Sequence, residues 1–189
     1  MPVAARGLHY LLATPFRYGY AKPSRFRRAR KRPGLFYASE HIASAVAETA
    51  YWRLLFFSRS PGFSPPTAVV EHSAFTVEIA ADRAIDLTVP PFDADVARWM
   101  APGDYSACQD FAARARGIDA QAIRYASVRD PDHRANIALF DPTAFATPAP
   151  TIEQTWHFRY EAGQITALAA FPSNERYAFG FGIFGLSAP

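Results

Sequence analysis

One glutamate stands inside a long, mostly apolar stretch of this chain. The stretch from Ser39 to about Phe57 is predicted to be a helix, because Ser39 can cap its start and the proline-rich segment 58–66 ends it. Helical spacing places Glu48 in a polar quarter of this helix, bordered by the aromatic ring of Trp52. The carboxylate is therefore either a solvated surface group or part of a binding cleft. The polar quarter consists of Glu40, His41, Ser44 and Glu48.

Residues upstream of this helix have the chemistry that binds an anion. Arg17 precedes Tyr18, and Arg25 precedes Phe26. A guanidinium group is planar, keeps its proton at physiological pH and can meet two phosphate oxygens at once. Together with the glutamate, these residue types suggest a site for an anion and a ribose.

Two further polar residues fit such a site, although each also has an ordinary structural explanation. Tyr37 stands just before the predicted helix, and Ser127 is expected at the end of a strand, before a turn. A tyrosine can stack on a flat ring or bind a sugar hydroxyl, but it can equally be a core residue. A serine in that place can hold a ligand or simply cap the turn.

Composition limits the class of protein. The chain has 189 residues, 50% of them hydrophobic, which predicts one domain over residues 1–189 with the basic N-terminal segment included. Cys108 is the single cysteine, so neither an internal disulfide nor a cysteine-based zinc site is expected. The five histidines lack metal-ligand spacing, so no metal is expected. The apolar patch Leu8 to Phe16 is too short to span a membrane, which favours a soluble cytoplasmic protein.

The net charge of +3 hides a strong asymmetry along the chain. Residues 1–39 contain nine Lys or Arg and no acid, so the rest of the chain is net negative. A basic run of this kind attracts polyanions, which include nucleotide phosphates, nucleic acid and acidic proteins. The alternative is a solvated basic loop without a partner.

Patterns along the rest of the chain predict a mixture of helices and strands. Apolar residues alternate from Trp156 to Tyr160, and the turn at 161–163 predicts a hairpin that returns through Phe171. The segment 177–186, rich in Gly and Phe, is expected to be a closing strand or core plug, with a homodimer contact as the alternative. Strands are expected near 67–79, 85–89, 118–127 and 137–140, and helices over 93–100 and 105–116.

The order and spacing of these segments resemble the RES domain, a family named for its Arg, Glu and Ser and found as the toxin of RES–Xre toxin–antitoxin pairs. The resemblance covers most of the chain. Two glycine positions of the family are replaced here, within 26–29 and 132–136, so detailed hydrogen bonds of those loops are not carried over. The matching segments are 16–18 and 24–26 for the arginines, Tyr37 to Glu48 for the tyrosine and glutamate, and 125–129 with 138–140 for the serine.

The resemblance implies an α+β fold, a compact single-domain α/β/α arrangement with a mixed or antiparallel sheet, like that of ADP-ribosyltransferases. It implies NAD as the substrate, cleaved between nicotinamide and ribose by phosphorolysis or hydrolysis. The alternative chemistry is transfer of ADP-ribose to a protein target. The implied catalytic residues are Glu48, Arg25 and Ser127, and the implied NAD-binding residues are Arg17, Tyr18, Arg25, Tyr37 and Ser127.

The resemblance also implies a partner, an Xre-type antitoxin, which an acidic segment would hold to the basic residues 1–39. A rival hypothesis is a nucleic-acid binder or RNA-directed toxin built on the basic arm, with the aromatic rings near it as stacking faces. A third is an interaction module without enzymatic activity. We expect neither membrane binding nor direct nucleic-acid binding, since Glu48 would repel a phosphate chain.

Overall fold

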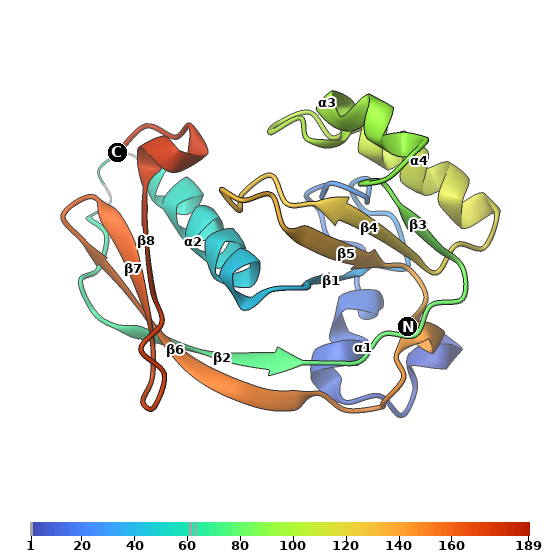
Figure 1. Ribbon diagram of the computed structural model, residues 1–189, viewed down its shortest axis with the longest axis horizontal. Coiled ribbons are helices and arrows are strands. Elements are labelled where there is room, and N and C mark those ends of the chain that lie inside the picture. The colour runs from blue at the N-terminus through green and yellow to red at the C-terminus, as the bar shows by residue number, and fades with distance from the viewer. Residues whose placement is uncertain (1, 61, 63) are drawn as a thin grey trace. The chain divides into compact units, whose positions relative to one another are not determined.

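The computed structural model describes residues 2–60, 62 and 64–189, and it confirms the α+β class (Figure 1). The chain divides into two compact units. The first unit runs to Glu40 and includes Val77–Val128 and Arg134–Thr151. The second includes the segments 41–76, 129–133 and 152–189. A single domain over the whole chain, related to ADP-ribosyltransferases, stays a prediction.

The first unit is built on a mixed sheet of four strands. Its strand order is β1-β5-β4-β3, in which β3 and β4 run parallel and the other neighbours run antiparallel. The strands are β1 (Phe36–Ser39), β3 (Ala84–Asp86), β4 (Ala122–Ala126) and β5 (Ala135–Leu139), and the helices are α1 (Tyr10–Arg17), α3 (Val96–Trp99) and α4 (Ser106–Gly117). Short 3-10 turns accompany them at η1 (Val3–Ala5), η2 (Phe92–Asp95) and η3 (Pro142–Ala144).

Helix α4 covers one face of this sheet (Figure 1). Small side chains at helical spacing, Cys108, Ala112 and Ala115, are buried against Ile123 and Tyr125 of β4. Because side chains alternate along a strand, the pairing of β1, β5 and β4 puts Tyr37 and Tyr125 on this same face. The sheet thus fixes the direction in which the predicted site tyrosine points.

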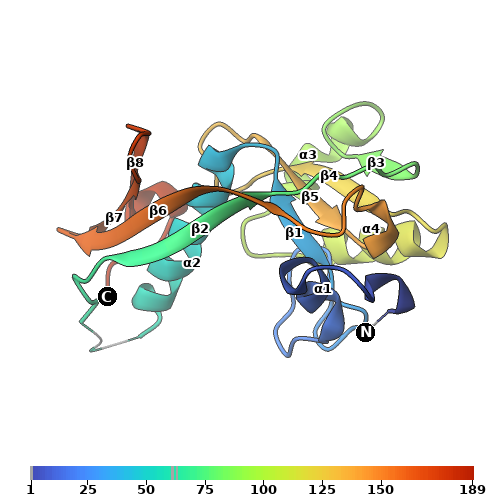
Figure 2. The same cartoon turned by 90° about the horizontal axis from the view of Figure 1, so that it is seen from below.

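The second unit is built on another four-stranded sheet, in the order β2-β6-β7-β8. Figure 2 shows β2 and β6 running side by side, and β6, β7 and β8 are antiparallel. The hairpin predicted around residues 161–163 is confirmed as β6 and β7, and the predicted closing strand is β8. The elements are α2 (Ile42–Ser58), β2 (Val70–Thr76), β6 (Thr151–Glu161), β7 (Gln164–Ala169), β8 (Arg176–Gly180) and the 3-10 turn η4 (Phe181–Phe184).

Helix α2 packs one face on this sheet. Val46, Ala50 and Leu54 join a buried cluster with Phe158 of β6 and Ile165 of β7. Each fully buried Val, Leu, Ile or Phe side chain stabilises the fold by about 1.5–3 kcal/mol. The apolar face therefore holds the helix on the sheet. Ser44 and Tyr51 of α2 are also buried, although they do not belong to this cluster.

The prediction that Ser39 caps helix α2 is wrong. Ser39 is the last residue of β1, where it is paired with Asn136, and the helix begins at Ile42 after His41. Strand pairing extends the backbone at Ser39 and so removes it from the helix start. The helix predicted over 93–100 is divided into η2 and α3, and α1 occupies the apolar patch at 8–16. In the described part of the chain, no helix has both the length and the apolar character needed to cross a membrane.

Candidate functional site

Helix α2 presents Ser44, Glu48 and Tyr51 on one face, because their spacing of four and three residues equals two turns. The Ser44 hydroxyl donates a hydrogen bond to the Asp130 carboxylate. The guanidinium carbon of Arg129 lies 3.7 Å from the centroid of the Tyr51 ring. Glu48 is half-buried and stands between these two contacts along the helix. All five residues belong to the second unit.

The segment 129–133 that meets α2 is a tight turn with two buried charges. Arg129 is 7% exposed and Asp130 is 1% exposed. The backbone N–H of Asp132 donates to Asp130 Oδ1 at 3.1 Å, and that of His133 donates to the Asp130 carbonyl at 2.9 Å. A cation as buried as Arg129 needs nearby negative charge, and Asp130 is the buried acid of its own turn. The face of α2 that carries Glu48 thus also carries Ser44 and Tyr51, which contact these two buried charges.

Tyr37 anchors the arginine segment of the first unit. Its Oη accepts a hydrogen bond from the Phe26 backbone N–H at 3.1 Å and shares another with Ser24 Oγ at 2.9 Å. Burial of this hydroxyl raises the pKa of Tyr37 to about 12, although hydrogen bonds to it and the charges of nearby arginines lower that pKa in part. The residue as a whole is 38% exposed. The Phe26 ring packs against Tyr125, 4.7 Å between centroids.

One nitrogen of the Arg25 guanidinium forms hydrogen bonds within the first unit. Its Nη1 donates to the Trp99 carbonyl at 2.7 Å and to the Ala101 carbonyl at 3.1 Å. The group also lies over the Tyr105 ring at 4.8 Å, and the residue is buried. These bonds hold the segment after α3. They leave Nε and Nη2 as the nitrogens with which Arg25 could meet a phosphate.

The other predicted site residues differ in their access to solvent. Arg17 and Tyr18 are exposed, with the guanidinium carbon 5.7 Å from the ring centroid. In the described residues, neither of them forms a hydrogen bond or ring contact with Arg25 or Tyr37. Ser127 follows the last residue of β4, as predicted, and is fully buried, with its backbone N–H donating to the Arg134 carbonyl at 2.9 Å.

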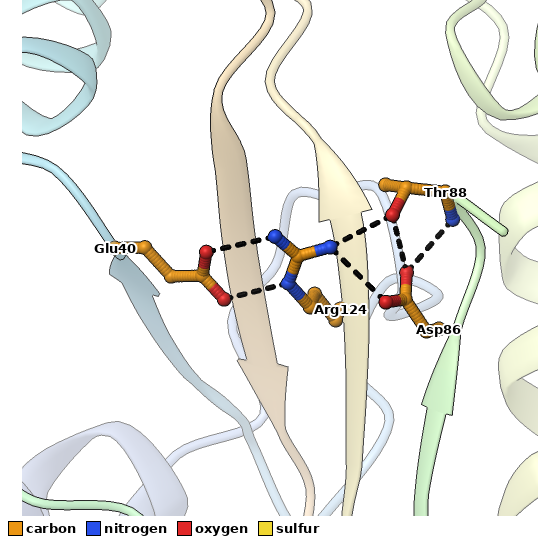
Figure 3. Close-up of polar contacts among 4 residues, drawn as sticks. All are labelled: Glu40, Asp86, Thr88 and Arg124. Carbon is orange, nitrogen blue, oxygen red and sulfur yellow. Dashed lines mark hydrogen bonds and ion pairs between the residues drawn. The ribbon is translucent and has the colours of Figure 1, made fainter.

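A charged network that the sequence analysis did not predict lies on the face of the first sheet opposite to α4 (Figure 3). Arg124 on β4 binds both carboxylate oxygens of Glu40, at 2.7 and 2.9 Å. Its Nη1 donates to Asp86 at 3.0 Å and to the Thr88 hydroxyl at 2.7 Å. The hydrogen bonds that Arg124 donates to Glu40 raise the pKa of the guanidinium, so the group stays charged. The network ties the end of β1, just before α2, to β3 and β4.

The chain belongs to the RES domain family, whose model matches residues 1–161. The family is known from toxin–antitoxin systems, in which the RES protein is the toxin and is typically paired with an antitoxin. A comparison with curated proteins finds no match. Membership therefore supports a toxin-like role.

The two units divide the predicted site residues between them. Glu48 lies in the second unit, and the other five lie in the first. Their roles stay predictions. The sequence analysis did not assign a role to Arg129, Asp130 or Tyr51. Two signals could have identified them: the cluster of charged residues after Val128, and the i+3 spacing of Glu48 and Tyr51. Among the described residues, no cluster of His, Cys, Asp and Glu is placed to hold a metal ion.

Proposed function

We propose that this protein is a toxin-type enzyme that consumes NAD by cleaving the bond between nicotinamide and ribose, through phosphorolysis or hydrolysis. Family membership supports the toxin-like role. The observation that carries the chemistry is the position of Glu48, half-buried on α2 between the Ser44–Asp130 and Tyr51–Arg129 contacts. A carboxylate in a fixed polar setting is the group that this reaction needs.

The reaction makes a specific demand on the protein. Nicotinamide leaves as a neutral ring from a cationic pyridinium, so the leaving group needs little acid assistance. Positive charge instead develops on the ribose, in an oxocarbenium-like transition state. Glu48 would stabilise this charge, and loss of one such preorganised group typically costs about 2.7–4 kcal/mol of the activation free energy. Arg129 and Asp130 would fix the turn beside Glu48 without touching the reacting atoms.

The family resemblance implies further NAD-binding residues, all of which belong to the first unit. Arg17 is an exposed cation beside an exposed ring, Tyr18, which suits a phosphate and a flat base. Arg25 would contribute its Nε and Nη2 to the pyrophosphate, and Tyr37 would stack on the nicotinamide or bind the ribose. Ser127 is fully buried. Binding of the carboxamide or ribose by Ser127 therefore requires the turn that follows β4 to open.

The test is the product spectrum after incubation with NAD, with and without inorganic phosphate. Hydrolysis gives nicotinamide and ADP-ribose, phosphorolysis gives a phosphorylated ADP-ribose, and transfer gives a labelled protein. Glu48→Gln keeps the side-chain volume and removes the charge, and we expect turnover to fall about 100-fold or more with the fold retained. Glu175→Gln is the matched control, since Glu175 is an exposed acid on the loop before β8. Equal turnover in the two variants would exclude Glu48 as the catalytic carboxylate.

We further propose that an Xre-type antitoxin inhibits the enzyme by placing an acidic segment over Arg17 and Arg25, where it competes with NAD. The excess of positive charge in residues 1–39 attracts a carboxylate-bearing chain as it attracts pyrophosphate. Titrating NAD into a complex of the antitoxin with the Glu48→Gln variant should lower the antitoxin affinity. An affinity that does not change with NAD would place the inhibitor at another surface.

A further inference from the structure

The basic loop that follows α1 is a folded element. Arg27 is buried and acts as its internal brace, since its Nη1 donates to the carbonyls of Tyr20 and Arg28, both at 3.1 Å. Its Nη2 donates to the Lys22 carbonyl at 2.7 Å. Ser24 and Arg27 also pair through their backbones. The loop therefore satisfies a buried cation with its own carbonyl groups, and its conformation is fixed.

Two glycines show that both arms of this loop lie side by side. A Cβ on Gly19 would lie 2.6 Å from the Arg30 carbonyl oxygen. A Cβ on Gly34 would lie 1.9 Å from the Pro15 carbonyl oxygen, which the fold could not accommodate without moving backbone. The Arg30 backbone N–H also donates to the Tyr20 carbonyl at 2.8 Å. Residues 18–20 and 30–32 thus form one continuous surface.

The outer side of this surface combines cations with two exposed rings. Tyr18 is 46% exposed and Tyr20 is 47% exposed, and their rings meet edge to face at 6.2 Å. The cations are exposed and, within the described residues, form no ion pair with a carboxylate. Arg28 is different, because it is paired with Asp110. We call this surface the basic platform, which consists of Tyr18, Tyr20, Lys22, Arg30, Lys31 and Arg32.

We propose that the basic platform binds single-stranded nucleic acid. Exposed aromatic rings beside a row of cations are the features on which successive bases stack while the phosphate backbone is neutralised. The platform contains neither a helix nor a strand that could enter a duplex groove. An acidic protein segment would use the cations, but it would leave the two exposed rings without a role.

This proposal departs from the expectation drawn from the sequence. That expectation rested on repulsion between Glu48 and a phosphate chain. No residue up to position 39 is acidic, so the segment that forms the platform carries no carboxylate of its own that would repel a phosphate chain. The platform shares Tyr18 with the proposed NAD site, but oligonucleotide binding is measured without NAD turnover, so the two proposals can fail separately.

The experiment measures binding of fluorescent 12-mers of oligo-dT and oligo-U by the full chain over a range of salt concentrations. Single-stranded binding releases about 0.7 counterion per phosphate contact, so the logarithm of affinity should fall steeply with the logarithm of salt. The variant Arg30→Gln, Lys31→Gln, Arg32→Gln should reduce this slope by about 2, for three lost contacts. The matched control makes the same charge change at three exposed arginines elsewhere, Arg59→Gln, Arg114→Gln and Arg176→Gln, and should keep the slope.

A second variant tests the stacking role and guards against a misfolded triple variant. Tyr20→Leu keeps an apolar side chain but removes the ring, and it should weaken oligonucleotide binding about tenfold at constant salt. The proposal is overturned if neither oligonucleotide binds, or if the control triple variant loses as much affinity as the platform variant. Equally tight binding of poly-glutamate, unaffected by Tyr20→Leu, would show an acidic-protein site instead. The third alternative is a lipid-binding surface. It would be shown if phosphatidylserine vesicles bind through the same three cations and oligonucleotides do not bind.

Discussion

The Arg129 guanidinium stacks on the Tyr51 ring, with 3.7 Å between the guanidinium carbon and the ring centroid. Both residues are buried, and Tyr51 is one helical turn after Glu48 on α2. A cation over an aromatic face in a desolvated setting is stabilised by about 2 kcal/mol. The ring thus helps to hold a positive charge on the face of α2 that carries the proposed catalytic carboxylate.

Replacement of the ring should affect turnover. We expect Tyr51→Leu to lower kcat for NAD about tenfold or more, because Arg129 then loses the surface that orients it. Phe56→Leu is the control, since Phe56 is an exposed aromatic residue on the same helix. Steady-state kinetics and the free energy of unfolding should be measured for both variants. If kcat falls only in proportion to the fraction of protein that is unfolded, Tyr51 has a purely structural role.

The buried hydrogen bond between Ser44 and Asp130 should matter for stability. Ser44→Ala leaves a buried carboxylate with one donor fewer, and we expect a loss of about 1.5–3 kcal/mol in the free energy of unfolding. Ser58→Ala serves as the comparison, because the Ser58 hydroxyl donates to the Leu55 carbonyl of its own helix at 3.0 Å. That change should cost less than about 1 kcal/mol. Urea denaturation measures both, and equal losses would contradict the prediction.

Arg25 allows its structural role to be separated from its proposed binding role. Arg25→Lys keeps the charge but removes the planar fork, so we expect KM for NAD to rise several-fold. The carbonyl groups of Trp99 and Ala101 also lose their shared donor, which should lower Tm by a few degrees. Arg28→Lys, at an exposed ion pair with Asp110, should change neither quantity. A lower Tm with KM unchanged would leave Arg25 as a structural residue alone.

The Arg124 network predicts a pH dependence of stability. Burial raises the pKa of Asp86, but hydrogen bonds from Thr88 and the charge of Arg124 lower it by more, so the folded pKa lies below the ordinary 3.8. A lowered folded pKa stabilises the protein above about pH 4, and this contribution is lost as the pH falls further. Asp86→Asn should therefore cost about 1 kcal/mol at pH 7 and progressively less toward pH 3.

A double-mutant cycle supplies the control for this network. In an Arg124→Gln background, Asp86→Asn should change the free energy of unfolding at pH 7 by less, because the Arg124 guanidinium donates a hydrogen bond to Asp86 at 3.0 Å. Urea unfolding at pH 7, 5 and 3 measures all four proteins. Additive effects at pH 7 would show that the bond does not contribute to stability.

Local patterns in the sequence determined the elements of this fold and the residue types of the site. The alternation from Trp156 to Tyr160 and the turn after it predicted the β6–β7 hairpin, because strand alternation and turn chemistry act over a few residues. Helical spacing likewise placed Glu48 on a polar face of α2. The family resemblance rested on the same local segments, and the family match over residues 1–161 confirmed it.

Tertiary structure decided what depends on residues far apart in the chain. Ser39 failed as a helix cap because it pairs with Asn136 on another strand. Arg124 binds Glu40, 84 positions away, and the Ser44–Asp130 bond spans 86 positions. No local pattern encodes such contacts, since they form only when long-range burial of the cores repays the entropy of closing the chain. For that reason the sequence indicated Glu48, whereas only the fold showed that its neighbours on the helix, Ser44 and Tyr51, contact the buried charges Asp130 and Arg129.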